Sequence, residues 1–475
     1  MNKLNNQCCN PFLPSWEYVP DGEPRVFGER VYLFGSHDRA HGFVYCQNDY
    51  VCWSAPVDNL AEWRYEGVIY KKTTDPLNAD GSMTLYAPDV VQGPDGKYYM
   101  YYVLDKARVV SVAKCDSPAG EYEFYGYVHY LDGTRLGSKE GDEPPFDPGV
   151  YVEGDKVYLY SGLGVLGDST RKGAFAMVLD KDMVTIVESP EIIVPSLTYG
   201  RDTDFRGHEF FEAASMRKID RKYYFIYSSV HMTELCYAIS SYPTKGFVYG
   251  GVLVSNSDLN ISDYKPANKR TYPTGNNHGS LLQIGKQWYV FYHRMTNGTW
   301  FSRQACAEPI TIQSNGRIKQ VEITSQGMNG KPLHGLGTYP AYICCNLYND
   351  VQEFNSDGKK AKITQDGRDA EPTEIPNQED AYIADITDGT VIGYKYFNLQ
   401  GVKKITLRTR AYGRGEFQIR TSPEGGVLGT VPVTSSNVWT DFSANVRILD
   451  GVQPLYFTYK GSGTPHLLSF TLQGS

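Results

Sequence analysis

Five polar side chains recur at the start of one type of strand along the chain. They lie in the stretches PDGEPRVF, APDVVQG, FDPGVYV, FFEAASMRKI and NNHGSLLQI, and they are Asp21, Asp89, Asp147, Glu212 and His278. Each lies about ten residues before the first aromatic residue of the strand that follows. Taken singly, an aspartate beside Pro or Gly is a turn residue that accepts a backbone hydrogen bond. Their recurrence at one repeat position favours convergence of the side chains.

Carboxylates that converge in a cleft could catalyse glycoside hydrolysis. Neighbouring carboxylates shift each other's pKa, so that one is protonated at neutral pH while another stays ionised. Glycoside hydrolysis needs this pair, because an acid protonates the leaving oxygen and a second carboxylate acts on water or on the sugar.

The elements that must position these groups are five similar aromatic strands, each preceded by a tight turn. The strands lie in GERVYLFGS, DGKYYMYYV, GDKVYLYSG, DRKYYFIYSS and GKQWYVFYHR, which recur about every 60 to 70 residues. Similarity of such long period indicates a propeller or a solenoid, and long helical patterns do not intervene. We expect an all-β chain with a five-bladed β-propeller over residues 1–335, whose blades surround a central channel.

Composition and charge exclude several classes of function. The chain has 475 residues, a formal net charge of -8 and 13% aromatic residues, with 47 Gly and 26 Pro. A nucleic-acid partner is not expected, because a basic stripe is missing. A membrane span is not expected either, because no apolar run is long enough. Nothing in the sequence indicates the oligomeric state.

The cysteines and the N-terminal residues bear on localisation. Nine cysteines, with adjacent pairs at Cys8-Cys9 and Cys344-Cys345, suit neither a disulfide framework nor a zinc motif. The start MNKLNNQCCNPFLPSW contains no continuous apolar segment of a secretory signal. We expect a cytoplasmic protein with reduced thiols, or a secreted one whose signal has been removed.

Residues 8 to 335 resemble glycoside hydrolase family 43. The resemblance rests on NPFLPSWEYVPDGEP, YAPDVV, FDPGVYV, FFEAASM and NNHGSLL in this order. It implies a five-bladed propeller and an inverting mechanism in which Asp21 is the general base, Glu212 the general acid and Asp147 the carboxylate that raises the acid's pKa. The chain departs from the family at Tyr86, where Trp is common, and at Ala213-Ala214, where Gly-Pro follows the acid.

A second group of residues is expected to contact the sugar. Aromatic rings can bury the apolar face of a sugar, although each of these rings could instead belong to the hydrophobic core. Asp89 could instead orient other side chains. Arg303, placed after the last blade strand, resembles an active-site arginine of the family. His278 either coordinates a central ion through water or forms a hydrogen bond as a neutral imidazole. The complete set is Trp16, Tyr18, Trp53, Tyr86, Asp89, Phe146, His278, Trp300 and Arg303.

The sequence pattern changes from about residue 340 onward. A polar stretch, DGKKAKITQDGRDAEPTEIPNQ, is followed by alternating strands such as KKITLRTRAYGRGEFQIRT. This pattern predicts a β-sandwich of the jelly-roll type over residues 340–475. The domain resembles carbohydrate-binding module family 6, which implies sugar sites on loops and a structural calcium ion. A role in stabilising the propeller or shaping its cleft is the alternative.

These observations predict an exo-acting, inverting glycosidase that needs no cofactor for its chemistry. Its expected product is terminal L-arabinofuranose from arabinoxylan- or arabinan-derived oligosaccharides of the plant cell wall. β-D-Xylosidase activity, alone or combined with the first, is the close alternative, because the two pentoses present similar hydroxyl arrays. Galactofuranosidase activity is more remote. A different class, a non-catalytic sugar-binding propeller, would leave three carboxylates in acid, base and modulator positions unexplained.

Overall fold

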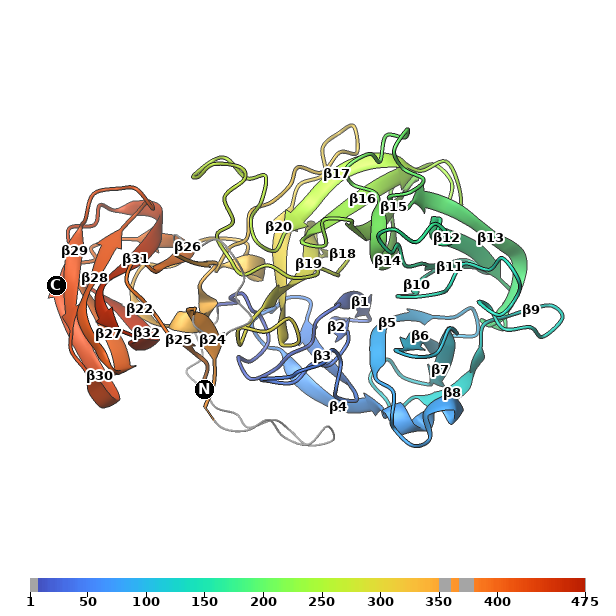
Figure 1. The fold of residues 1–475 in the computed structure, drawn as a ribbon, viewed down its shortest axis with the longest axis horizontal. Helices are drawn as coiled ribbons and strands as arrows, with labels where there is room; N and C mark the ends of the chain where they lie inside the picture. The colour runs from blue at the N-terminus through green and yellow to red at the C-terminus, as the bar shows by residue number, and fades with distance from the viewer. Residues whose placement is uncertain (1–6, 350–359, 367–379, 475) are drawn as a thin grey trace.

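The computed structural model describes residues 7–349, 360–366 and 380–474, and these are built almost entirely of strands. Figure 1 shows five sheets arranged in a ring and, beside them, a separate pair of sheets formed by the C-terminal part of the chain. This confirms the predicted five-bladed propeller followed by a β-sandwich. Helical turns are short, and none of the described helices is long and apolar enough to cross a membrane.

The five blades follow one another along the chain, and each begins with its innermost strand. Blade 1 has β1 (Glu23–Phe27), β2 (Arg30–Phe34), β3 (Tyr50–Pro56) and β4 (Arg64–Tyr70). Blade 2 has β5 (Leu85–Gln92), β6 (Tyr98–Leu104), β7 (Ser111–Cys115) and β8 (Glu123–Tyr127). Blade 3 has β10 (Gly149–Glu153), β11 (Lys156–Ser161), β12 (Gly173–Leu179) and β13 (Thr185–Pro195), with β9 (His129–Tyr130) at its edge. Blade 4 has β14 (Phe210–Ile219), β15 (Lys222–Ser229), β16 (Glu234–Ser240) and β17 (Val248–Ser255), and blade 5 has β18 (Leu281–Ile284), β19 (Gln287–Met295) and β20 (Arg303–Ile310).

The predicted aromatic strands are β2, β6, β11, β15 and β19, the second strand of each blade. Each pairs antiparallel with the innermost strand before it. Apolar side chains form clusters where adjacent blades meet, for example around Val157 of β11 and Phe175 of β12, between blades 2 and 3. Blade-to-blade burial therefore fixes the innermost strands around the channel.

The N-terminal segment joins blade 5 to blade 1. The amide of Phe12 donates to the carbonyl of Ala305 in β20, at 3.2 Å. The buried side chain of Asn10 donates to the carbonyl of Ala307 at 2.9 Å and accepts from its amide at 3.0 Å. These bonds satisfy the free edge of β20 and close the ring.

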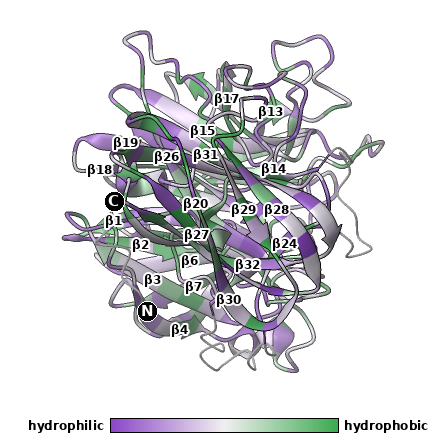
Figure 2. Ribbon diagram, turned by 90° about the vertical axis from the view of Figure 1, so that its left-hand side faces the viewer, coloured by the Kyte–Doolittle hydropathy of each residue, from purple (hydrophilic) through white to green (hydrophobic). Residues whose placement is uncertain are grey.

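The sandwich consists of two sheets. Its first strand, β21, lies just before residue 335, the predicted end of the propeller. One sheet contains β21 (Leu333–His334), β23 (Asn346–Tyr348), β26 (Val391–Leu399), β31 (Gly451–Gly463), β28 (Gly413–Arg420) and β29 (Gly429–Val433). The other contains β22 (Gly337–Pro340), β24 (Lys362–Thr364), β25 (Tyr382–Ala384), β32 (His466–Gln473), β27 (Lys404–Ala411) and β30 (Ser436–Asn445). Figure 2 shows hydrophobic and hydrophilic residues following one another along these strands. The 3-10 turns are η1 (Lys72–Thr74), η2 (Pro76–Asn78), η3 (Gly327–Asn329) and η4 (Ala341–Ile343). Most of the polar stretch predicted at 357–378 lies outside the described residues.

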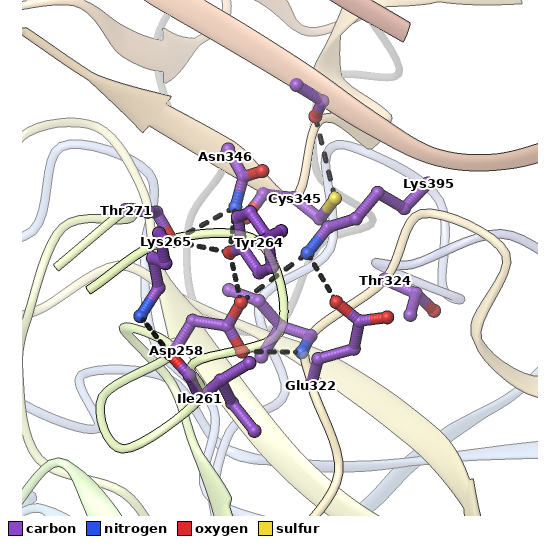
Figure 3. A network of polar contacts seen from close by, with 12 residues as sticks. Asp258, Ile261, Tyr264, Lys265, Thr271, Glu322, Thr324, Cys345, Asn346 and Lys395 are labelled. Atoms are coloured by element: carbon purple, nitrogen blue, oxygen red, sulfur yellow. Dashed lines mark hydrogen bonds and ion pairs between the residues drawn. The ribbon is translucent and has the colours of Figure 1, made fainter. Parts of the chain in front are cut away.

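A buried polar network joins the sandwich to blades 4 and 5 (Figure 3). Lys395 of β26 lies 2.8 Å from Glu322 and 3.4 Å from Asp258, a carboxylate that follows β17. The side chains of Lys395 and Asp258 are 1% and 0% exposed. Asp258 also accepts from the hydroxyl of Tyr264, and Asn346 of β23 donates to that hydroxyl at 3.2 Å. The two parts of the chain are therefore connected by a buried lysine–aspartate pair, with the partly exposed Glu322 at its edge.

Substituting Lys395 with alanine should destabilise the full chain. The substitution leaves the buried carboxylate of Asp258 without its cation, and breaking a buried pair in this way costs about 3–5 kcal/mol of unfolding free energy. Chemical denaturation followed by fluorescence would measure the loss. Lys460→Ala, which removes an exposed lysine, is the control. A loss in K395A no larger than that of the control would contradict the structural role.

Candidate active site

The innermost strands bring four of the five recurring side chains to one end of the channel. Asp21 lies two residues before β1, Asp147 two residues before β10, Glu212 within β14 and His278 shortly before β18. The inner strands β1, β5, β10 and β14 contact one another in order around the channel, and β1 also contacts β18. Positions far apart in sequence thus form one site, as the repeat predicted.

The backbone at these positions is unusual. Asp21 has a φ of 56°, Asp147 of 44°, and Ala213, directly after Glu212, of 71°. A non-glycine residue in the left-handed region costs roughly 1–3 kcal/mol and persists where its surroundings enforce it, commonly at functional sites. Gly149 shows how tightly the inner strands approach, because a Cβ there would lie 2.4 Å from the carbonyl oxygen of Ala214. The glycine therefore lets β10 and β14 place Asp147 beside Glu212.

Asp21 lies among cationic and neutral partners. Nη1 of Arg303 lies 2.9 Å from its Oδ1, and Nδ1 of His293 lies 3.3 Å from the same oxygen. The amide of Asp21 donates to Nδ1 of His293, and Nε2 lies 2.8 Å from the carbonyl of Asn276, which suits a neutral ring protonated on Nε2. Burial opposes the charge of Asp21, but Arg303, with a smaller contribution from His278, outweighs burial and lowers its pKa. Asp21 is therefore ionised at neutral pH.

The surroundings of Glu212 raise its pKa, whereas those of Asp21 lower the pKa of that residue. Burial, and then the charges of Asp147 and Asp21, raise its pKa to about 8, against the effects of His278 and Arg303. Asp147 is close by, because its Oδ2 accepts from the amide of Ala213 at 3.1 Å. Its effect on Glu212 exceeds that of Asp21. One site thus contains a protonated carboxyl and an ionised carboxylate.

His278 is paired with Asp147. Its Nδ1 lies 3.5 Å from Oδ2 of Asp147, and this carboxylate overcomes burial and raises the pKa of His278 to about 9. Calcium prefers six to eight oxygen ligands. Within the described residues, His278 belongs to no group of three or more His, Cys, Asp or Glu side chains whose ligand atoms lie within 4.8 Å of one another. The contacts favour a cationic imidazole over direct coordination, and an ion held through water stays a prediction.

Asp89 does not face the site, which corrects its assignment to sugar binding. Its side chain is 0% exposed and pairs with Arg25 at 2.7 Å. Its Oδ2 also accepts from the amide of Val150 at 2.9 Å. Asp89 lies within the paired part of β5, opposite Tyr101 of β6, and its carboxylate faces Arg25 of β1 and the backbone of β10. Asp89 connects blades 1, 2 and 3. This matches the alternative prediction from the sequence, in which Asp89 orients other side chains.

Asp38 is a site residue that sequence reasoning missed. Its Oδ2 lies 2.7 Å from Nε of Arg303 and its Oδ1 lies 3.0 Å from Nη2, a bidentate pair. This pair holds the guanidinium while Nη1 reaches Asp21. Asp38 lies in the loop between β2 and β3, where the repeat pattern gives no signal. Arg303 is the first residue of β20 and not, as predicted, a residue beyond the last blade strand.

Comparisons with known proteins show to which family the chain belongs. The model of glycosyl hydrolases family 43 matches residues 10–318. A xylosidase/arabinosidase of Thermoclostridium stercorarium is 59% identical over 476 residues, covering 99% of both chains. The chain belongs to glycosyl hydrolase family 43.

Two more distant relatives match beyond the propeller. An arabinoxylan arabinofuranohydrolase of Bacillus subtilis is 24% identical over 94% of this chain and 88% of its own. A solved structure of a family 43 arabinoxylan arabinofuranohydrolase from Bacillus subtilis, in complex with cellotetraose, has a TM-score of 0.52 at 20% identity, with 98% and 97% of the two chains covered. This likeness shows that the two chains have the same fold, both in the propeller and in the sandwich. The resemblance of the sandwich to carbohydrate-binding module family 6 stays a prediction.

Two predicted platform residues belong to the core of this family 43 chain. Trp16 and Trp53 are 6% and 3% exposed and lie 5.8 Å apart in the apolar cluster between blades 5 and 1. The indole of Trp53 donates to the buried Glu17 at 2.8 Å. A sugar ring cannot stack on a tryptophan that the protein already covers, so the assignment of both to sugar binding is wrong.

Tyr18 is also buried, at 2% exposure, and its assignment to sugar binding is likewise corrected. Its hydroxyl donates to Gln365 at 3.0 Å and accepts from Asn297 at 3.1 Å. Gln365 follows β24 of the sandwich, and Asn297 lies in the loop between β19 and β20 that leads to Arg303. Tyr18 therefore joins the sandwich to the rim of the site.

The remaining aromatic candidates are more open. Tyr86 and Phe146 are half-buried and meet edge to face at 5.6 Å, and Trp300 is 40% exposed. Sequence reasoning missed Tyr45, whose half-buried ring lies 4.7 Å from the guanidinium of Arg303 and 4.7 Å from the ring of Phe301. Its loop has no motif, so only the contact with Arg303 reveals it.

Proposed function

We propose that this family 43 glycosidase is an exo-acting, inverting enzyme that releases terminal L-arabinofuranose, with β-D-xylosidase activity second. The observation that carries the proposal is the pairing of an ionised Asp21 with a protonated Glu212 at one end of the channel. Asp21 takes a proton from a water molecule that attacks the anomeric carbon. Glu212 donates its proton to the leaving oxygen. Both steps use the protonation states that the surroundings impose at neutral pH.

Asp147 and His278 support the acid in this mechanism. Asp147 raises the pKa of Glu212, and its bond to the amide of Ala213 holds it at the acid's backbone. His278 carries a positive charge beside Asp147 and so partly offsets the negative charge of the carboxylates in the site. Inversion requires room for water between base and sugar, so we expect the carboxyls of Asp21 and Glu212 roughly 6.5–9.5 Å apart. Proton NMR of the first product anomer tests the stereochemistry.

Three loops near the carboxylates support exo action. The loop at 37–48 carries Tyr45 and Asp38, and the loop at 296–302 carries Trp300 and leads to Arg303. The loop at 162–172 lies beside the acid, because the amide of Gly164 donates to the carbonyl of Phe211 at 2.6 Å. Loops from three blades beside one site suit a chain end better than the interior of a polymer.

The choice of pentose is supported by the names of the relatives, which combine xylosidase and arabinosidase or specify arabinofuranose removal. Nitrophenyl α-L-arabinofuranoside and β-D-xylopyranoside, assayed side by side, test it. We expect the larger kcat/KM for the arabinofuranoside. Higher activity on the xyloside would reverse the order, and inactivity on both would overturn the pentosidase proposal. Binding without hydrolysis, preserved in Asp21→Asn and Glu212→Gln, would favour the non-catalytic alternative.

Substituting Asp147 with asparagine should move the alkaline limit of activity to lower pH. Activity needs protonated Glu212, so in the wild type it falls as the pH rises through about 8. Removing the charge of Asp147 lowers the pKa of Glu212, and activity should then be lost roughly 1 pH unit earlier. His278 loses its partner too, which reduces the shift. The pH profile of kcat measures it, and an unchanged alkaline limb would exclude the modulator role.

A further inference from the structure

A second group of chemistry-bearing side chains lies in blade 4, outside the proposed mechanism. His208, His231 and Glu234 have ligand atoms that all lie within 4.8 Å of one another. His208 precedes β14, His231 lies in the turn between β15 and β16, and Glu234 begins β16. We propose that these three side chains bind one divalent transition-metal ion of the zinc class.

The ligand types favour zinc over calcium or magnesium. Two imidazoles with one carboxylate form a set that zinc binds with a water as fourth ligand, whereas the hard cations prefer oxygen alone. Glu234 is 4% exposed at its side chain and His208 is 29% exposed, while His231 is open to solvent. The site is thus anchored at its base and accessible at one side, which an entering ion requires.

Neighbouring residues already orient the ligands. The ring of His208 stacks on Tyr249 at 4.8 Å and 12°, with Nδ1 2.6 Å from Oε1 of Glu234. Ser229 donates to that carboxylate oxygen at 2.6 Å and accepts from the amide of His231 at 3.2 Å. Such outer contacts fix ring and carboxylate orientation in metal sites. Two ligand atoms on a tetrahedral zinc lie about 3.3 Å apart, so His208 and Glu234 need to separate by less than about 1 Å.

Zinc would replace a proton at this site. In the absence of metal, Nδ1 of His208 donates a hydrogen bond to Oε1 of Glu234 at 2.6 Å. The ion takes over that nitrogen, and the proton leaves to solvent. Zinc affinity should consequently fall as the pH is lowered. Other groups near His208 are the thiol of Cys236, 3.9 Å from Nδ1, the rings of Tyr249 and His231, and the carboxylate of Glu209.

The site is on the same face as the catalytic carboxylates. Glu212 pairs with Ser228 in the ladder of β14 and β15, and Phe210 pairs with Ser229. The carbonyl of Thr233, in the same turn as His231, accepts from the side chain of Asn277 at 3.2 Å. Asn277 directly precedes His278. A bound ion would therefore stabilise the turn that supports the histidine of the active site.

Calorimetric titration of the chelator-treated full chain with ZnCl2 tests the proposal. We expect one equivalent to bind, and His231→Ala, which alters an exposed side chain, to weaken binding at least about 100-fold. His334→Ala, at another exposed histidine, should bind as the wild type does. Glu234→Gln should lose the same equivalent, and excess CaCl2 should not displace zinc.

Three results would overturn the proposal. They are a wild type that binds no zinc, a His231→Ala variant that binds it equally well, and displacement of zinc by calcium at equal concentration. With chelator present, the activity of His231→Ala should equal that of the wild type, which shows that a loss of zinc binding is not a loss of folding. A visible absorption spectrum of four-coordinate Co²⁺, seen in the wild type and lost in His231→Ala, would support the ligand set independently.

Discussion

Substituting Glu212 with glutamine should reduce kcat on a pentose oligosaccharide about 10²–10⁴-fold, because the leaving oxygen then departs without a proton. The loss should be much smaller on a nitrophenyl glycoside, whose leaving group is stable as an anion. The alkaline limb near pH 8 should also disappear, since the group whose pKa sets it is gone. Steady-state kinetics with both substrates over a range of pH measure these effects.

The dependence on leaving group separates catalysis from folding. A misfolded variant would lose activity equally on both substrates. Glu121→Gln, which changes an exposed glutamate in the same way, should leave kcat and KM unchanged. Equal losses on the two substrates in a folded Glu212→Gln protein would remove Glu212 from the acid role.

Substituting Asp21 with asparagine should reduce kcat by a similar factor of about 10²–10⁴, but equally for good and poor leaving groups. Asp21 acts on water and not on the leaving oxygen, so the quality of the leaving group does not compensate for its loss. The substitution also leaves Arg303 facing a neutral amide, although Asp38 still holds the guanidinium at 2.7 Å. The pocket should therefore keep its shape.

Affinity for a pentose product checks that shape. Asp21→Asn should bind L-arabinose or D-xylose within a few-fold of the wild type while hydrolysing very little. If Asp21→Asn retained more than a tenth of the activity, another group would have to supply the base. A variant that loses product binding and activity together would instead indicate a binding role for Asp21.

Several features of the fold and site follow from local sequence patterns. Turn residues ahead of alternating aromatic strands recur five times, and this was enough to predict the blades. Propeller repetition then predicted that Asp21, Asp147, Glu212 and His278 would meet at one end of the channel. These four side chains meet because each lies just before, or near the start of, an innermost strand, at the end of the channel where these strands begin.

Other features depend on contacts between residues far apart in the chain. Asp89 recurs at a similar offset, yet it lies within the paired part of β5 and contacts Arg25 and not the pocket. Trp16 and Trp53 have the composition of a sugar platform, but adjacent blades cover them. Whether an aromatic ring faces core or ligand depends on what packs against it, and one strand's sequence does not contain that information.

The sequence by itself determined the five-bladed propeller and the sandwich that follows it, because both depend on local strand and turn patterns. The resemblance to family 43 then indicated which three of the recurring side chains to propose for catalysis. Tertiary structure alone decided which charges surround each carboxylate. Asp38 holds Arg303 against Asp21 across 265 residues of chain, and Asp147 reaches the backbone beside Glu212 across 66. Those long-range pairs place a cation beside one carboxyl and an anion beside another, which separates their pKa values and so their chemistry.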